Sequence, residues 1–92
     1  MPRFVIEREM PGVGSLSTED LRAGARKSNE VLAGLAPRAQ WQQSYVTRDK
    51  IYCVWIADDE DVIREHAGRS GFPCTVISRV SMLIDPTTDE TP

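Results

Sequence analysis

The most apolar stretch of the chain is IYCVWI, residues 51–56, which has no charged or amide side chain at either parity. Because successive residues of a strand point to opposite faces of a sheet, this run predicts a strand that is buried on both faces. The surrounding stretch AQWQQSYVTRDKIYCVWIAD, residues 39–58, predicts two strands around a tight turn at Arg48-Asp49. The pattern raises the question of what covers the second face of this hairpin.

A two-residue turn fixes which side chains of the hairpin share a face. It places Tyr45 opposite Tyr52 and Trp41 opposite Ile56. One face then carries these four residues with Gln43 and Val54, and the other carries Gln42, Ser44, Val46, Ile51, Cys53 and Trp55. Both faces are substantially apolar, although a shift of one residue in the turn would change this assignment.

Two other segments have the spacing of amphipathic helices. The first is predicted between Ser17, which starts a variant of the capping box, and Pro37, which ends the helix. The second is predicted between Asp58 and Gly71. Its first turn is acidic, which suits a helix N-terminus, and Gly71 stands where a helix commonly ends on a glycine.

Residues 3–7 and 75–84 predict the two remaining strands, and the polar sequence 85–92 predicts a flexible tail. The order strand, helix, strand, strand, helix, strand within one domain, residues 1–92, is that of the ferredoxin-like βαββαβ sandwich. This α+β fold has a four-stranded antiparallel sheet, here with room for a short extra strand, and two helices on one face. The other face would expose apolar side chains, so we expect a homodimer through that sheet face.

Composition narrows the function classes. The chain has 92 residues and a net charge of −3, which argues against nonspecific binding of nucleic acid because that requires an excess of Lys and Arg. No apolar run approaches the ~20 residues of a membrane span, and the N-terminus lacks the apolar core of a signal peptide. We therefore expect a cytoplasmic protein. Cys53 and Cys74 are then expected to be reduced, mostly buried thiols, with a disulfide or a thiolate metal site as the alternatives.

Four blocks of sequence, in order, resemble a known family. They are FVIERE-PG-G-LS-EDL, QW--SYVT-DKIYCVWIA, IREHA--SGFP and IDPTT, and they span roughly residues 3–88. These blocks are similar to those of a small bacterial domain family of unknown function, in which one described member is a dimeric, ferredoxin-like, nickel-binding protein. The resemblance implies nickel ions bound at the surface of a dimer and a role in metal sequestration or tolerance. The chain departs from the pattern at Cys74 and Thr75, where a small residue and a polar amide are expected.

The candidate nickel ligands are His66, Glu65 and Asp61. Nickel favours imidazole and carboxylate ligands, and His66 is the one histidine of the chain. The residues one helical turn from His66 are not good ligands, so a site that uses His66 must recruit another element or another chain. The alternative is a core histidine bonded to a backbone or tyrosine oxygen. Asp61 and Glu65 are four residues apart and could bind a surface cation, or they could form an ordinary solvated helix face.

A second hypothesis is a dimeric α/β-barrel-like protein that binds or transforms a small molecule. Its pocket would involve Glu7, Tyr45 and His66, with Tyr52 and Cys53 as further lining residues. A carboxylate on an apolar strand, such as Glu7, needs a donor partner if it is buried. No recognisable catalytic constellation accompanies these residues, so a metal-binding protein without enzymatic activity is the first expectation.

Overall fold

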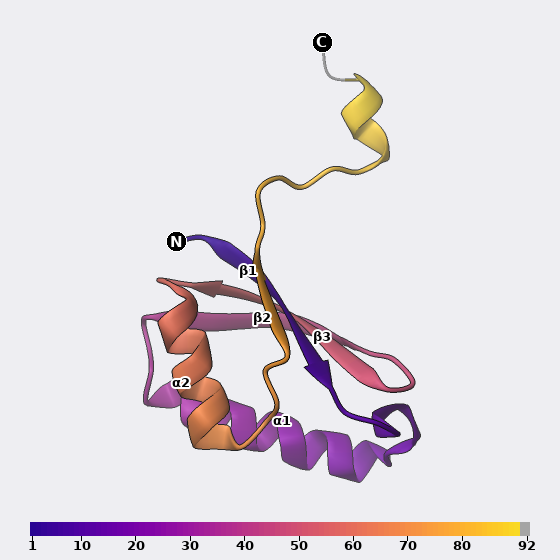
Figure 1. Cartoon of the computed structure of the whole chain (residues 1–92), viewed down its shortest axis with the longest axis vertical. Coiled ribbons are helices and arrows are strands. Elements are labelled where there is room, and N and C mark those ends of the chain that lie inside the picture. Colours follow the sequence, from indigo (N-terminus) through magenta and orange to yellow (C-terminus); the bar gives the residue numbers. More distant parts are fainter. Residues whose placement is uncertain (91–92) are drawn as a thin grey trace.

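The computed structural model describes residues 1–90 and is built around one antiparallel sheet with strand order β2-β3-β1-β4. Both helices lie on one side of this sheet (Figure 1). The strands are β1 (Arg3–Glu9), β2 (Ala39–Val46), β3 (Lys50–Ala57) and β4 (Val76–Arg79). The α-helices are α1 (Thr18–Ala33) and α2 (Glu60–Ser70), and two short 3₁₀ helices are η1 (Val13–Ser15) and η2 (Pro86–Glu90). The predicted ferredoxin-like α+β fold is confirmed, with four strands in the described residues and without the short extra strand.

Both helices begin at their predicted caps and α2 ends at its predicted glycine, whereas α1 ends at Ala33, with Gly34 as its C-cap, before the predicted stop at Pro37. The Ser17 side chain accepts a hydrogen bond from the Asp20 backbone N–H at 3.0 Å, and Asp59 caps α2 in the same way through the Val62 N–H. Gly71 ends α2 with φ of 80°, a left-handed conformation that glycine adopts without a steric cost. Neither helix within residues 1–90 is long and apolar enough to cross a membrane.

The two faces of the sheet differ in what covers them. On the side of the helices, Phe4, Ile6 and Trp55 are almost completely buried and form the centre of the core. The residues between them in sequence, such as Val5 and Val54, point to the opposite side and are only half-buried. We call this second side the open face, which carries Val5, Glu7, Tyr45, Tyr52, Val54, Ile56 and Val76.

The predicted register of the hairpin is right near the turn and wrong at its far end. Tyr45 pairs with Tyr52 as expected, but Trp41 pairs with Trp55 and not with Ile56. A β-bulge between Trp41 and Gln43 adds one residue to β2, which reverses the faces beyond it. Trp41 therefore lies on the helix side of the sheet, against the core.

The last strand is shorter than the predicted range 75–84. It ends at Arg79 because its partner β1 begins at Arg3, and the Val80 N–H donates to the Arg3 carbonyl as the final bond of the ladder. The chain then runs beyond the sheet as an arm (Figure 1). This arm, residues 81–85, leads into η2, and residues 91–92 of the expected tail lie outside the described residues.

The loop after β1 docks against the β2–β3 turn through its backbone. The Gly14 N–H donates to the Arg48 carbonyl at 3.0 Å. A Cβ atom at Gly14 would lie 2.7 Å from the Thr47 carbonyl oxygen and 2.9 Å from the Arg48 Cα, closer than real Cβ atoms approach backbone. Glycine is thus required for this close approach, which holds η1 beside the sheet.

The substitution Gly14→Ala is expected to lower the free energy of unfolding by about 1–3 kcal/mol, because backbone must move to admit the methyl group. Gly68→Ala is the matched control. Gly68 lies within α2 with open space around its Cα, so alanine should stabilise the helix by up to about 1 kcal/mol. Urea denaturation of both variants measures the difference, and equal stability of the two would contradict the docking role of Gly14.

Candidate functional site

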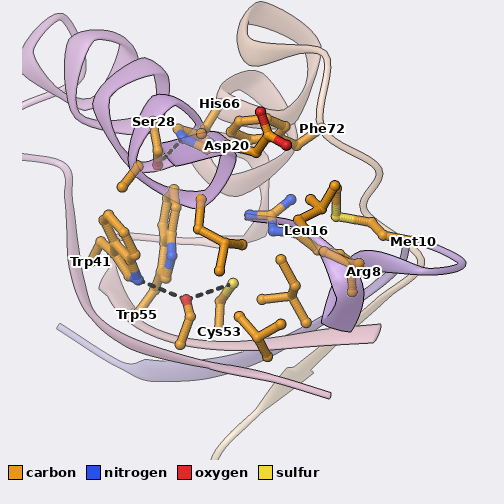
Figure 2. A pocket seen from close by; sticks show the side chains of 17 residues that line it. Arg8, Met10, Leu16, Asp20, Ser28, Trp41, Cys53, Trp55, His66 and Phe72 are labelled. Atoms are coloured by element: carbon orange, nitrogen blue, oxygen red, sulfur yellow. Dashed lines mark hydrogen bonds between the residues drawn. The ribbon is translucent and has the colours of Figure 1, made fainter. Parts of the chain in front are cut away.

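A cavity among the described residues lies between α1, η1 and the helix side of the sheet. Its volume is about 360 Å³, within the ~300–1,000 Å³ range of small-molecule sites. Figure 2 shows the side chains of β1, β2, β3, α1 and α2 that converge on it. Most are apolar: the lining consists of Arg8, Met10, Val13, Leu16, Asp20, Leu21, Gly24, Ala25, Ser28, Trp41, Ser44, Val46, Ile51, Cys53, Trp55, His66 and Phe72.

Arg8 places a guanidinium group in the wall of this cavity. The residue is only 4% exposed, because position 8 of β1 has the same parity as the core residues Phe4 and Ile6. Its Nη1 donates to the Pro73 carbonyl at 2.8 Å, and its guanidinium carbon lies 6.0 Å from the centre of the Trp55 ring. Within residues 1–90, no carboxylate lies within ion-pair distance of Arg8.

His66 reaches the same cavity from α2. It is 1% exposed, its Nε2 is 3.0 Å from the Ser28 hydroxyl, and its ring meets the Trp55 ring edge-on at 4.5 Å. Its Nδ1 is buried and has no hydrogen-bond partner within residues 1–90. Burial, and after it the positive charge of Arg8, lowers the pKa of His66 to about 4, against the opposing contribution of Ser28. The imidazole is therefore neutral at pH 7.

A short chain of hydrogen bonds crosses the floor of the cavity. The Trp41 indole N–H donates to the Ser44 hydroxyl at 2.9 Å, and that hydroxyl donates to the Cys53 sulfur at 3.0 Å (Figure 2). The bulge in β2 makes this chain possible because it turns Trp41 to the helix side. Cys53 is buried, Cys74 is half-buried, and neither forms a disulfide within the described residues.

The structure divides the predicted pocket residues between the two sides of the sheet. Cys53 and His66 line the cavity, whereas Glu7, Tyr45 and Tyr52 lie on the open face. Glu7 pairs with the Lys50 ammonium at 3.4 Å. Tyr52, and after it Glu7, raises the pKa of Lys50. Glu7, Tyr45 and His66 therefore do not share one pocket.

The three candidate nickel ligands also lie apart. Asp61 and Glu65 are on the solvent side of α2, where Glu65 is paired with Arg69 and Arg38, while the His66 ring points into the cavity. Within residues 1–90, no three His, Cys, Asp or Glu side chains are grouped closely enough to hold a metal ion. The donor atoms of one chain therefore do not fit a nickel centre by themselves.

Sequence reasoning missed Arg8, Ser28 and Trp41 as cavity residues. Arg8 carried a signal, since it is the one charged side chain at the core parity of a strand that otherwise places Phe4 and Ile6 there. Ser28 gave no distinct signal, because a small residue in a predicted helix also suits close packing of that helix. Trp41 could not be assigned to the helix side of the sheet, because the sequence of this bulged strand does not differ recognisably from that of a regular strand.

The geometry defines a ferredoxin-like α+β domain with an interior cavity on its helix-covered side. The family model described as nickel responsive protein SCO4226-like matches residues 4–80, and the chain belongs to this family. The crystal structure of SCO4226 from Streptomyces coelicolor A3(2) is 15% identical and superposes with a TM-score of 0.75, over 89% of this chain and 99% of that chain. At this identity the likeness shows the fold alone. A search of curated proteins finds no match.

The low pKa of His66 predicts a loss of stability in mild acid. Between pH 6.5 and about 4 the unfolded chain binds a proton at this residue that the folded protein does not. Stability is therefore fully retained above pH 6.5 and falls as the pH drops, by up to about 1.4 kcal/mol per pH unit.

The variant His66→Gln keeps a side-chain amide near Ser28 and removes the titration. Urea denaturation between pH 7 and pH 5 should show a smaller loss of stability for this variant than for the wild type. Carboxylates that titrate below pH 5 affect both proteins equally and cancel in the comparison. Parallel stability profiles of the two proteins would contradict the assignment.

Proposed function

We propose that this protein binds nickel as a homodimer and that it serves in sequestration of, or tolerance to, the metal. The observation that carries this proposal is the match of residues 4–80 to a family described as nickel responsive. Nickel would be the bound ion, and the open face of the sheet would be the contact between the two copies. The open face and the arm after β4 support the dimer, and the positions of Asp61 and Glu65 on α2 support a metal site at the surface.

The open face supports a contact with a second copy. Within residues 1–90 the chain has two α-helices, both on the other side of the sheet, and this face has no covering layer (Figure 1). Its centre is apolar, with Val5, Val54 and Ile56 side by side on neighbouring strands, and Tyr45 at its edge is 57% exposed. A two-fold pairing of sheets buries the same patch of both copies at once.

The arm after β4 supports the same contact. Met82, Leu83 and Ile84 are 68–77% exposed, so residues 1–90 leave three successive large apolar side chains largely uncovered. Leu83 borders a hollow at the edge of the open face, together with Tyr45 and Val54. A second copy on this face would cover both the arm and the strands.

The positions of the donor atoms support a metal site that is completed between chains. The exposed Asp61 and the half-buried Glu65 supply two carboxylates one helical turn apart, which is fewer ligands than a nickel ion binds. They remain the proposed carboxylate ligands. The remaining ligands would come from a molecule that contacts the solvent side of α2, since a copy paired across the open face lies on the other side of the sheet. His66 is disfavoured because Arg8 places a positive charge beside it in an apolar interior.

Titration of nickel into tag-free protein at roughly 100 μM is expected to release or absorb heat by calorimetry. The double variant Asp61→Asn with Glu65→Gln should weaken binding by roughly tenfold or more, since charged ligands are lost. His66→Gln is the matched control and should bind nickel as the wild type does. Absence of heat with the wild-type protein would overturn nickel binding, and normal binding by the double variant would exclude these two ligands.

The variant Val54→Asp is expected to convert the dimer to a monomer, because it places two like charges within an apolar contact. Sedimentation velocity at micromolar concentration measures the change, and Asn29→Asp on the exposed surface of α1 adds the same charge elsewhere as a control. A wild-type protein that sediments as a monomer, with and without nickel, would contradict the dimer. Because Asp61 and Glu65 lie on the other side of the sheet from Val54, the Val54→Asp variant is expected to bind nickel as the wild type does.

A further inference from the structure

The cavity under α1 contains a buried positive charge that the described chain leaves without a negative partner. Burial of an ionised side chain is costly unless a counter-charge or several hydrogen bonds compensate it. Arg8 has one such bond, to the Pro73 carbonyl. Asp20 is the one acidic residue in the lining, and it is solvent-exposed and forms no ion pair with Arg8 within residues 1–90.

We propose that this cavity binds a small organic carboxylate with an apolar body, whose carboxylate pairs with the Arg8 guanidinium. The site is separate from the nickel site and uses none of its proposed ligands. A guanidinium has five N–H donors in a planar fork, and a carboxylate can accept two of them in parallel. Arg8 thus has donors left for a ligand after its bond to Pro73.

The remainder of the lining selects the rest of the ligand. Trp41, Trp55 and Phe72 supply aromatic walls, and aliphatic side chains from α1, β2 and β3 complete them. Apart from Arg8 and the exposed Asp20, the polar groups of the lining include the Ser28 and Ser44 hydroxyls and the His66 imidazole, which its low pKa keeps neutral. The cavity therefore offers one positive charge within an apolar space, the complement of a carboxylate on a hydrocarbon chain or ring.

The size and the opening of the cavity set the length of the ligand. At roughly 30 Å³ for each water-sized unit, a volume of about 360 Å³ holds on the order of a dozen heavy atoms. Decanoate has this size. Leu16 and Val46 line the cavity and are 44% and 43% exposed, so they mark its mouth and give a ligand access from solvent.

Titration with decanoate, below the concentration at which it forms micelles, tests the proposal, and decan-1-ol serves as the neutral ligand of equal length. Trp41 and Trp55 are the two tryptophans of the chain and both line the cavity, so their fluorescence reports occupancy. Decanoate is expected to bind the wild type more tightly than decan-1-ol. Arg8→Gln should weaken decanoate by roughly tenfold or more and change decan-1-ol by less than about threefold.

A second variant tests the location without removing Arg8. A Cβ at Gly24 meets only the Phe72 ring, at 4.0 Å, so Gly24→Leu extends from α1 into the cavity without a backbone clash. It should abolish binding of both ligands and keep the thermal midpoint of the wild type or raise it. Gly68→Leu, on the exposed side of α2, makes the same change of residue away from the cavity and should bind as the wild type does.

Three outcomes would overturn the proposal: no fluorescence change with either ligand, equal affinity for decanoate and decan-1-ol in the wild type, or wild-type affinity in Gly24→Leu. None of these three outcomes depends on whether the Arg8→Gln variant folds. All titrations are done with a chelator present, so they do not depend on nickel. Calorimetry of Gly24→Leu with nickel should give the wild-type result, and this separates failure of the cavity proposal from failure of the metal proposal.

Discussion

The structure depends on one constraint: two helices cover only one face of a four-stranded sheet. β3 places apolar side chains on both faces of the sheet, so these side chains are removed from water only if both faces are covered. On the helix side, Cys53 and Trp55 are buried by the chain itself. On the other side, Tyr52 and Val54 are only half-buried, and the chain supplies no second layer within residues 1–90. The helix-covered face therefore becomes an interior, and the open face becomes a surface available to a partner.

The covered face is closed by a few contacts that also shape its cavity. Ser28 of α1 and His66 of α2 approach each other above Trp55. This contact between the two side chains joins the helices at the centre of the core. Toward the other end of α1, Gly24 and Ala25 have little or no side chain, and the space they leave is part of the cavity. The close approach of Gly14 to the β2–β3 turn holds η1 beside this space. The same packing that closes the core thus leaves a defined volume within it.

Local signals predicted what local physics determines. Helix caps at Ser17 and Gly71, and strand pairs near the Arg48-Asp49 turn, depend on residues close in sequence, and these were right. Trp41 was assigned to the wrong face because a single bulged residue reverses the parity of all that lies beyond it. The end of β4 was wrong because it depends on where β1 begins, which is distant in sequence. Residues of the cavity come from six elements and the loops between them, so no local pattern could have grouped them.

Charge separates the two proposed sites more clearly than position does. Glu7 and Arg8 are adjacent in β1 and have opposite charges. Glu7 points to the open face and Arg8 points to the interior. The surface has an excess of acidic groups, with 14 Asp and Glu against 11 Lys and Arg in the whole chain, whereas the cavity holds one buried guanidinium. A metal cation is thereby favoured outside and disfavoured beside Arg8, and a carboxylate has the opposite preference. The two proposed ligands, a cation and an organic anion, would accordingly not compete for one site.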